Sequence, residues 1–370
     1  MKILHVIDSA GIYGAEIMLL NLMEEHKIMS HVPILLSIEE PDAASGNAFS
    51  ERATSRGLSV IKINVGRGFS KGSGRRIWNI AEEHEVDLVH SHGYKGNILL
   101  GSVPRSVRKV PLISTIHGWT ATRVFTRIWY YKLLDRMFLR RTDAVVNVNS
   151  TGPCIGKVET FVVENGIPEL NFDNETSGDD EISVFCRGEF IVGSIARLSE
   201  EKGLIYLINA ISELHGRGVR LKAVIIGDGP QKKELENYIR RKNLAPSVML
   251  AGYRDKAYKY LPMLNVFVLP SLTEGLPITI LEALQAAVPT VASRVGGVSR
   301  VLGGGKFGVL TDPGDHRSIA DAIEYLHSNP EQAAEMGRKA KEAVLANYSI
   351  DRMAREYIKV YEAVLAKWKQ

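Results

Sequence analysis

Short runs of β-branched and apolar residues alternate with longer amphipathic stretches along the first half of the chain. The longer stretches, such as Ala15–Glu25 and Arg75–His84, space their apolar residues as a helix does. Strands that alternate with helices predict a parallel sheet, because parallel neighbours need a crossover connection. Right-handed crossovers give a doubly wound sheet that binds ligands at the carboxyl ends of its strands. The predicted strands are Lys2–Asp8, Val32–Ser37, Ser59–Asn64, Asp87–Ser91, Leu112–Thr115, Ala144–Asn149 and Phe161–Val163.

A polar, acidic segment interrupts this pattern at residues 169–187 and predicts a linker. The alternation then resumes, with helices expected at Gly203–Leu214 and Gln231–Lys242. We therefore expect two doubly wound α/β domains, at residues 1–168 and 188–350, and a C-terminal helix at residues 351–370 that packs back on the first domain. The strands expected in the second domain are Phe190–Ala196, Leu221–Gly227, Val248–Ala251, Val266–Leu269 and Thr290–Ala292.

Length and composition agree with two globular domains. The 370 residues are 45% apolar and 24% charged, as is ordinary for soluble proteins. The apolar runs are far shorter than the roughly 20 residues that cross a bilayer, and the N-terminus lacks the features of a signal peptide. We therefore expect a cytoplasmic protein. Cys154 and Cys186 are the only cysteines, and two free thiols are favoured over one bridge.

The charge distribution is uneven although the net charge is only +4. No acidic residue occurs between Asp87 and Asp135. Such a stretch favours anionic partners, such as phosphates, lipid head groups or nucleic acid. A solvated surface that is basic without binding anything explains the pattern equally well. The cations of this stretch are Lys95, Arg105, Arg108, Lys109, Arg123, Arg127 and Lys132.

The strongest local motif is LPSLTEGLPITILEAL, Leu269–Leu284. Glu274 is expected at or before the N-terminus of a helix, where unpaired N–H groups and a partial positive charge favour phosphate groups. Gly275 lets the backbone approach a ligand, and Glu282 would lie on one face of the helix. A capped helix after a buried strand, with Glu274 merely favouring the helix dipole, explains the same residues.

A second motif is GSIARLSEEKG, Gly193–Gly203. Arg197 and Lys202 follow a predicted strand at its carboxyl end, and two cations there suit a diphosphate. They would also stabilise charge on a departing nucleotide diphosphate. The alternative is a surface Arg197 paired with Glu200 or Glu201.

The motifs of both halves, in their order, resemble those of GT4-type retaining glycosyltransferases, which belong to glycosyltransferase group 1 and have the GT-B fold. The resemblance spans nearly the whole chain. The matching segments in the first half are His5-Val6, Gly14-Ala15-Glu16, Val89-His90-Ser91-His92-Gly93, Thr115-Ile116-His117-Gly118 and Asn165-Gly166-Ile167. Those in the second half are Gly193 to Gly203, Gly227-Asp228-Gly229-Pro230, Gly252-Tyr253 and Glu274-Gly275-Leu276-Pro277 with Glu282.

The resemblance implies two Rossmann-like domains facing each other across a cleft, the first on the acceptor side and the second binding a nucleotide-diphosphate sugar. It implies no metal and no other cofactor. Arg197, Lys202, Glu274 and His117 would be the catalytic residues, with the two cations on the diphosphate, Glu274 on the donor sugar and His117 beside the transferred sugar. Glu282 would bind the ribose hydroxyls. The remaining donor-binding positions would be Gly14, Gly193, Gly227, Gly275, Leu276 and Pro277, with Gly296 and Gly297 as a turn near the nucleotide and Glu16 and His92 on the acceptor side.

Two positions depart from the family pattern. Tyr13 stands where many members have a second glycine before Ala15-Glu16, and Arg300 stands in a region where many have a glutamate. His90 and His92, with His117, also suggest a metal site, but histidines that line a polar cleft are the favoured interpretation because further ligands are not evident.

For the reaction, we favour front-face transfer, in which the departing diphosphate helps to take the acceptor proton and the protein supplies positioning and electrostatics. A double displacement with Glu274 as nucleophile is the alternative. A nucleotide-sugar epimerase, a phosphorylase and a non-catalytic sugar-nucleotide-binding protein also fit the architecture. Nucleic-acid binding is not expected, since no recognisable module is present.

The donor base is left open between UDP and GDP, and the acceptor is expected to be a glycan or a lipid-linked sugar of polysaccharide, lipopolysaccharide or glycolipid assembly. Peripheral contact with anionic lipid at the inner face of the membrane is a further hypothesis. Its candidate surfaces are the cluster Arg67, Lys71, Arg75 and Arg76 and the segment Trp129–Arg141, which also fits an ordinary helix packed on its sheet.

Overall fold

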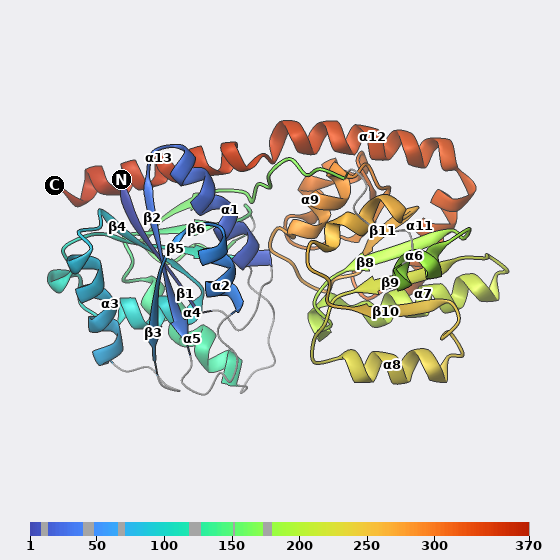
Figure 1. Cartoon of the computed structure of the whole chain (residues 1–370), viewed down its shortest axis with the longest axis horizontal. Helices are drawn as coiled ribbons and strands as arrows, with labels where there is room; N and C mark the ends of the chain where they lie inside the picture. The colour runs from blue at the N-terminus through green and yellow to red at the C-terminus, as the bar shows by residue number, and fades with distance from the viewer. Residues whose placement is uncertain are drawn as a thin grey trace. The chain divides into compact units, whose positions relative to one another are not determined.

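The computed structural model describes residues 1–8, 14–39, 48–65, 71–117, 127–150, 152–172 and 180–369. The chain divides into two compact units (Figure 1). The first unit comprises Met1–Gly166 with Ile350–Gln370, and the second comprises Ile167–Ser349. Each contains one parallel sheet with helices between its strands, which confirms the predicted doubly wound α/β class.

The first unit has a seven-stranded sheet of order β3-β2-β1-β4-β5-β6-β7. Apolar side chains of α3 and α4, Trp78 included, cover one face of this sheet in a core that includes Leu4, Val6 and Val89. The strands are β1 Lys2–Asp8, β2 Val32–Glu39, β3 Ser59–Asn64, β4 Leu88–His92, β5 Leu112–Ile116, β6 Ala144–Asn147 and β7 Glu159–Val162. The helices are α1 Gly14–Ile28, α2 Ala48–Ser55, α3 Lys71–Glu83, α4 Tyr94–Gly101, the 3₁₀ turn Arg105–Val107 and α5 Arg127–Leu139.

The second unit has a six-stranded sheet of order β10-β9-β8-β11-β12-β13. Leu, Ile, Val and Ala dominate its core. The strands are β8 Ile191–Ile195, β9 Lys222–Ile226, β10 Val248–Gly252, β11 Val266–Leu269, β12 Thr290–Ser293 and β13 Val309–Thr311. The helices are α6 Glu181–Cys186, α7 Leu204–Gly216, α8 Lys232–Arg241, α9 Ile278–Gln285, α10 Val298–Val301, α11 His316–Ser328 and α12 Pro330–Asn347, with 3₁₀ turns at Glu200–Lys202, Ala257–Met263 and Gly303–Gly305.

Two local predictions differ from the structure. The segment predicted as a linker contains α6, because Asp180 caps the helix by accepting a hydrogen bond from the Ser183 N–H at 2.7 Å and Ile182 and Cys186 are buried. The edge strand β13 was not predicted, because its three residues are too short for a periodic pattern. Cys154 and Cys186 are both free, as expected.

The C-terminal helix α13, Ile350–Trp368, belongs to the first unit, and Figure 1 shows it beside α1. Its spacing of apolar residues matches one buried face, which includes Met353, Tyr357 and Tyr361. Both tyrosines are fully buried. The last helix thus supplies two phenol groups to the interior of the first unit.

Most cations of the acid-free stretch are held by partners within the first unit. Lys95 pairs with Asp8 at 3.3 Å, Arg105 with Asp143 at 3.0 Å and Lys109 with Glu82 at 2.9 Å. Arg108 is buried and donates to the carbonyl oxygens of Val103, Leu100 and Arg141. These residues therefore have structural roles, and Arg123 lies outside the described residues.

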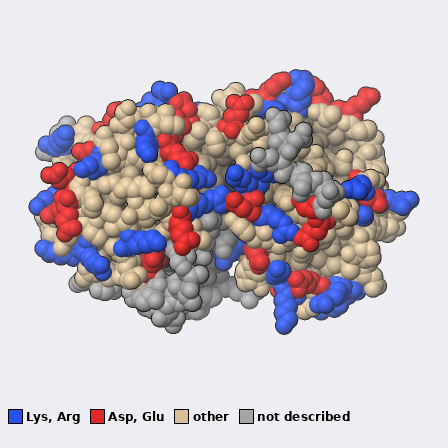
Figure 2. Space-filling view, viewed as in Figure 1, with Lys and Arg blue, Asp and Glu red and all other residues tan. Residues whose placement is uncertain are grey.

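Charged side chains on the face shown in Figure 2 also sit beside charges of the opposite sign, for example along α12. Arg338 on that helix contacts Glu335 and Glu342 at 2.7 and 2.5 Å, and Lys339 contacts Glu335 at 3.1 Å. Among the described helices, none is long and apolar enough to cross a membrane.

Candidate active site

An ion pair connects the two sequence motifs of the second unit. Lys202 follows β8, and its Nζ lies 2.6 Å from Oε1 of Glu274 in the loop between β11 and α9. The same carboxylate oxygen accepts a hydrogen bond from the Ser271 hydroxyl at 2.7 Å. The Glu274 side chain is 7% exposed and that of Lys202 is 23% exposed. Two residues that are 72 positions apart in the sequence thus meet at the carboxyl edge of the sheet.

Two glycines allow this close approach. Gly203, at φ +61°, packs so tightly that a Cβ there would come within 2.2 Å of the Pro270 carbonyl oxygen. Gly296, at φ +50°, packs against the loop of Glu274, whose carbonyl oxygen would lie 2.0 Å from a Cβ. The left-handed conformation and the lack of space both require glycine. The turn that includes Gly296 therefore holds the Glu274 loop, consistent with the predicted small-residue turn.

Glu282 on α9 is buried to 9% exposure. Burial raises the pKa of this carboxyl to about 7, and none of the described positive side chains offsets the effect. Such a group can accept hydrogen bonds from hydroxyl groups once it is ionised, or donate one while it is neutral. A desolvated carboxyl of this kind is a candidate ligand contact.

The other predicted site residues of the second unit lie in several segments of the chain. Arg197 follows β8 and is exposed. Gly275, Leu276 and Pro277 are buried and lead into α9. The first N–H groups of α9 have no acceptor within the helix. Gly193 lies inside β8, where a Cβ would come within 2.3 Å of the Leu264 side chain, so packing alone explains it. Gly227 follows β9 at φ +148°, where a Cβ would come within 1.9 Å of the Ala196 carbonyl oxygen.

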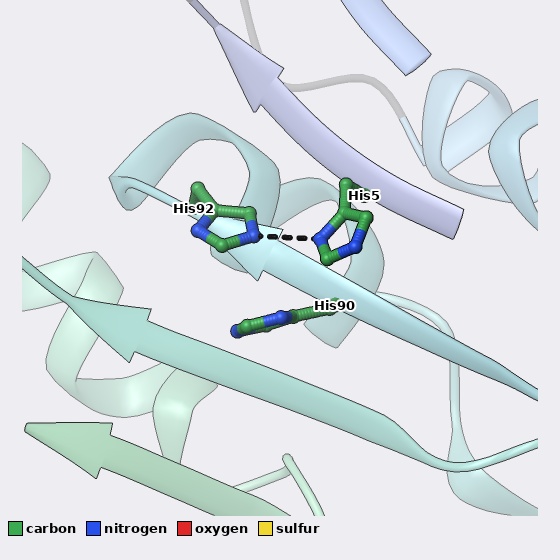
Figure 3. A group of neighbouring side chains, drawn as sticks. All are labelled: His5, His90 and His92. Carbon is green, nitrogen blue, oxygen red and sulfur yellow. Dashed lines mark hydrogen bonds between the residues drawn. The ribbon is translucent and has the colours of Figure 1, made fainter. Parts of the chain in front are cut away.

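In the first unit, strand register brings several histidines onto one face of the sheet. His5 of β1 pairs with His90 of β4, and His92 of β4 pairs with Thr115 of β5. Because side chains alternate along a strand and registered partners share a face, His5, His90 and His92 point the same way. Figure 3 shows the rings of His5 and His92 joined by a hydrogen bond and the ring of His90 beside them. This face is opposite to the apolar face that α3 and α4 cover.

A chain of hydrogen bonds runs through three of the histidines. Nδ1 of His5 lies 3.1 Å from Nε2 of His92 (Figure 3). Nδ1 of His92 lies 3.2 Å from Nε2 of His117, which follows β5. His5 is fully buried and His92 nearly so, whereas His117 is partly exposed. The predicted residue His117 is therefore connected to the sheet interior through His92, which was predicted on the acceptor side.

His90 has a separate set of partners. Its Nδ1 lies 2.7 Å from the Tyr361 hydroxyl of α13, and its Nε2 lies 2.7 Å from the Thr115 hydroxyl. Thr115 is in turn 3.1 Å from the Tyr357 hydroxyl. Burial lowers the pKa of His5, His90 and His92 well below the ordinary value, and lowers that of His117 to about 4. These imidazoles are therefore neutral at neutral pH.

His5, His90 and His92 also form a possible cation site, since one ring nitrogen of each lies within 4.8 Å of the others. Both nitrogens of His90 are within hydrogen-bond distance of hydroxyl groups, and Nδ1 of His5 and Nε2 of His92 face each other. A metal would have to replace these contacts. The donor set therefore fits a hydrogen-bond network better than a metal centre.

The remaining predicted residues lie at the start of α1. Gly14 is the first residue of the helix and is exposed, while Glu16 is 8% exposed. Tyr13 lies outside the described residues. The helix then continues to His26, which is fully buried with its ring 6.0 Å from that of His5.

A cavity of about 710 Å³ lies elsewhere in the first unit, at the amino ends of β6 and β7. Two of its cations are paired, Arg105 with Asp143 and Lys367 with Glu159 at 2.7 Å, and Arg140 and Lys157 also line it. Arg105 also stacks over Trp368 at 4.6 Å. Because it lies at the amino ends of β6 and β7, the cavity is at the opposite edge of the sheet from His92 and His117, which lie at the carboxyl ends of β4 and β5.

Comparison with known proteins identifies the family. Residues 179–343 match the family Glycosyl transferases group 1, and residues 12–151 match Glycosyltransferase Family 4. The chain belongs to this glycosyltransferase family. It is a GT4-type enzyme with the GT-B fold.

Relatives with established names include two bacterial transferases. Alpha-D-kanosaminyltransferase of Streptomyces kanamyceticus is 33% identical over 47% of this chain and 46% of that protein. The UDP-Gal:alpha-D-GlcNAc-diphosphoundecaprenol alpha-1,3-galactosyltransferase of Escherichia coli is 26% identical over 67% of this chain and 68% of that protein. Among solved structures, HepE of Anabaena in complex with UDP-glucose superposes with a TM-score of 0.82 at 20% identity, covering 98% of this chain and all of HepE. That likeness supports the fold.

Several contacts of the candidate site were not predicted from the sequence. Ser271, His5, Tyr357 and Tyr361 were given no role, although each contacts a predicted residue or its neighbour. For His5, a signal existed, because it occupies the same place in β1 as His90 does in β4. For the tyrosines of α13 the sequence contained no such signal, because 271 positions separate Tyr361 from His90.

Proposed function

We propose that this glycosyltransferase moves a hexose from a UDP-sugar to a hydroxyl group of a glycan or lipid-linked acceptor, with retention of the anomeric configuration. The observation that carries the proposal is the cluster of Lys202, Ser271 and Glu274 at the carboxyl edge of the second sheet, close in sequence to the N-terminus of α9. A cation and free helix N–H groups suit a diphosphate. Buried Glu282 on the same helix suits ribose hydroxyls.

Two named proteins support the donor and the stereochemistry. HepE holds UDP-glucose, and the E. coli relative is named for transfer from UDP-Gal into an alpha-1,3 linkage. The sugar–phosphate bond of UDP-galactose is itself α, so that reaction retains configuration. The acceptor of the E. coli protein carries a diphosphoundecaprenol group, which motivates a lipid-linked acceptor for this chain.

The contacts of Glu274 favour front-face transfer over a double displacement. Its Oε1 already accepts one hydrogen bond from the Lys202 ammonium and one from the Ser271 hydroxyl. A hydrogen bond donated by a cation withdraws negative charge from the accepting carboxylate and makes it a weaker nucleophile. In the proposed reaction Arg197 and Lys202 stabilise the departing diphosphate, Glu274 binds sugar hydroxyls, and His117 contacts the transferred sugar. No metal or other cofactor takes part.

The test has two steps. UDP, GDP and ADP, and their glucose and galactose conjugates, are added to the chain with and without Mg²⁺ while thermal unfolding is followed. A ligand at about 100 times its dissociation constant adds roughly 2.7 kcal/mol, so a metal-independent shift with the UDP series alone is expected. The preferred donor is then incubated with sugar acceptors, and the new linkage is identified by NMR. A β-linked product from an α-donor would disprove retention.

The same experiment separates the alternative functions. A sugar nucleotide that changes without an acceptor would indicate an epimerase. Formation of a sugar phosphate when inorganic phosphate is present would indicate a phosphorylase. Donor binding without transfer to any acceptor would indicate a non-catalytic binding protein.

A lipid-linked acceptor would bring the enzyme to a membrane. We therefore propose that α5 makes peripheral contact with anionic lipid. Tyr130, Leu133 and Met137 of α5 are 54%, 53% and 46% exposed. Their spacing places them on one side of the helix, and Arg136 and Arg140 are exposed nearby. Arg67 of the other predicted basic cluster lies outside the described residues. Vesicles of phosphatidylglycerol should bind the wild type but not a Leu133→Ser, Met137→Ser variant; equal binding of both would exclude α5.

A further inference from the structure

The carboxylate of Glu274 receives both of its hydrogen bonds on one oxygen. The Lys202 ammonium donates to Oε1 at 2.6 Å, and the Ser271 hydroxyl donates to the same atom at 2.7 Å. Among the described residues none donates to Oε2, and this atom is not one of the fully buried polar atoms that lack a partner. Oε2 is therefore the oxygen that can still accept a hydrogen bond from a hydroxyl group of a ligand.

The two donors to Oε1 differ in exposure and in freedom to move. The Lys202 side chain is 23% exposed, and its ammonium is at the end of a flexible four-carbon stem. Ser271 is 0% exposed, and a serine hydroxyl is only one rotatable bond from the backbone. A diphosphate would draw the Lys202 ammonium towards itself, whereas the buried Ser271 hydroxyl does not reach a ligand. Ser271 is therefore the donor that stays with the carboxylate when the site is occupied.

The backbone of the loop around Ser271 is held on both sides. The Leu272 N–H donates to the Glu201 carbonyl oxygen at 2.8 Å, and the Gly297 N–H donates to the Gly275 carbonyl oxygen at 2.8 Å. The first bond joins the loop to the turn after β8, and the second joins it to the turn after β12. The Ser271 Oγ thus has a defined position beside the carboxylate that it contacts.

We propose that Ser271 is a positioning residue for the donor sugar, because its hydroxyl holds Oε1 of Glu274 and leaves Oε2 to accept hydrogen bonds from the sugar. The inference rests on the proposed role of Glu274 in binding sugar hydroxyls. It adds that the protein binds one oxygen of this carboxylate and the sugar binds the other. A carboxylate held in this way loses less rotational freedom when the sugar binds, which favours binding.

Calorimetric titration of UDP and UDP-glucose into the wild type and Ser271→Ala tests the proposal. The quantity compared is the dissociation constant of UDP-glucose divided by that of UDP, since a change in this ratio between variants reports on the sugar. The ratio should rise about tenfold in Ser271→Ala, as for the loss of one hydrogen bond to a charged group, while affinity for UDP stays the same. An unchanged ratio, or an equal loss of affinity for both ligands, would overturn the proposal.

A control and a second variant address folding. Ser194 of β8 is also fully buried in the second unit, but its Oγ has no hydrogen-bond partner among the described residues. In Ser194→Ala the ratio should stay within about twofold of wild type; a tenfold rise there would contradict a specific role of Ser271. Ser271→Cys keeps a side chain of similar size with a weaker donor. It should raise the ratio in the same direction, and it decides the case if Ser271→Ala does not fold.

A double-mutant cycle shows whether Ser271 acts through Glu274. Glu274→Ala should raise the ratio by itself. Adding Ser271→Ala should then change it by less than about twofold, because the carboxylate that the serine holds is gone. Additive effects of the two substitutions would mean that Ser271 acts independently of Glu274, and its positioning role would be wrong.

The same titrations separate this inference from the proposed function. If the wild type binds GDP and GDP-glucose instead, the proposed donor is wrong, but the ratio for the GDP pair still tests Ser271. If UDP-glucose binds and no sugar is transferred, the proposed activity fails while the ratio still decides the role of Ser271. If the wild type binds no sugar nucleotide, both the function and the inference are overturned.

Discussion

The two units share one architecture but have different interiors. Aliphatic residues dominate the core of the second unit, and its ion pair of Lys202 and Glu274 lies at the edge of the sheet. In the first unit the face opposite α3 and α4 carries histidines, Thr115 and two tyrosines of α13. A doubly wound sheet therefore does not require an apolar interior on both faces. Many buried polar groups of the first unit have hydrogen-bond partners, and such a network specifies one arrangement more strictly than aliphatic packing does.

The largest expected effect is a difference in acid stability between the units. His5, His26, His90 and His92 are buried, and burial lowers each pKa below the ordinary value. The unfolded state then binds more protons, so the stability of the first unit falls as pH falls below about 6.5. Each imidazole that burial keeps neutral in the folded state adds to this loss as the pH falls towards 5. Asp135, whose pKa burial raises to about 6, offsets part of this.

The second unit should respond in the opposite direction. Glu282 has a folded-state pKa of about 7, above its ordinary value, so its neutral form stabilises the unit as pH falls through 7. Calorimetry at pH 7.5 and 5.0, with hydrogen exchange to identify the unit that opens, measures the difference. Earlier unfolding of the second unit at pH 5.0 would contradict the comparison.

The next effect concerns the edge of the second sheet. Replacing Arg197 with Ala removes a cation that we place on the departing diphosphate. Turnover should fall on the order of 10²–10³-fold, as when one oxyanion donor is lost. Arg300→Ala serves as a control, since we assign that residue no role. Near-normal turnover of Arg197→Ala, measured at saturating donor, would remove Arg197 from the mechanism.

A smaller effect tests the polar interior directly. Tyr361→Phe removes the hydroxyl that contacts Nδ1 of His90 and leaves that nitrogen without its partner. The free energy of unfolding should fall by about 1–3 kcal/mol. Phe267→Leu in the second unit changes a fully buried ring without removing a hydrogen bond, and it shows how a purely apolar core responds. No loss in Tyr361→Phe would mean that the His90 contact is not part of a required network.

The smallest effect is the pH dependence of donor binding. The ionised Glu282 carboxylate accepts hydrogen bonds from ribose hydroxyls more strongly than the neutral carboxyl does, so affinity for UDP-glucose should rise by up to about tenfold between pH 6 and pH 8. The diphosphate of UDP-glucose does not titrate in this range, which makes it a better probe than UDP. Calorimetric titrations of the wild type and Glu282→Gln measure the effect. A dependence that persists in Glu282→Gln would assign it to another group.

The sequence predicted most of the fold because its elements are periodic. β1, β3 and β11 have the predicted bounds, and most other strands differ by one or two residues at an end. Short elements escaped prediction. β13 has three residues, and α6 depends on one capping aspartate within a polar segment. The family motifs indicated Lys202, Glu274 and Glu282, but not that Lys202 and Glu274 contact each other.

Hydrophobic periodicity and motif order in the sequence alone determined the α/β class, the division into two Rossmann-like units and the glycosyltransferase family. These properties are local, or they depend on the order of segments. Tertiary structure decided which partners the polar residues have. Strand register joined His5 to His92, and the fold of α13 onto the first unit brought Tyr361 to His90. The reason is physical: a hydrogen bond depends on distances of about 3 Å between atoms, and no local pattern encodes such a distance between residues that are far apart in the chain.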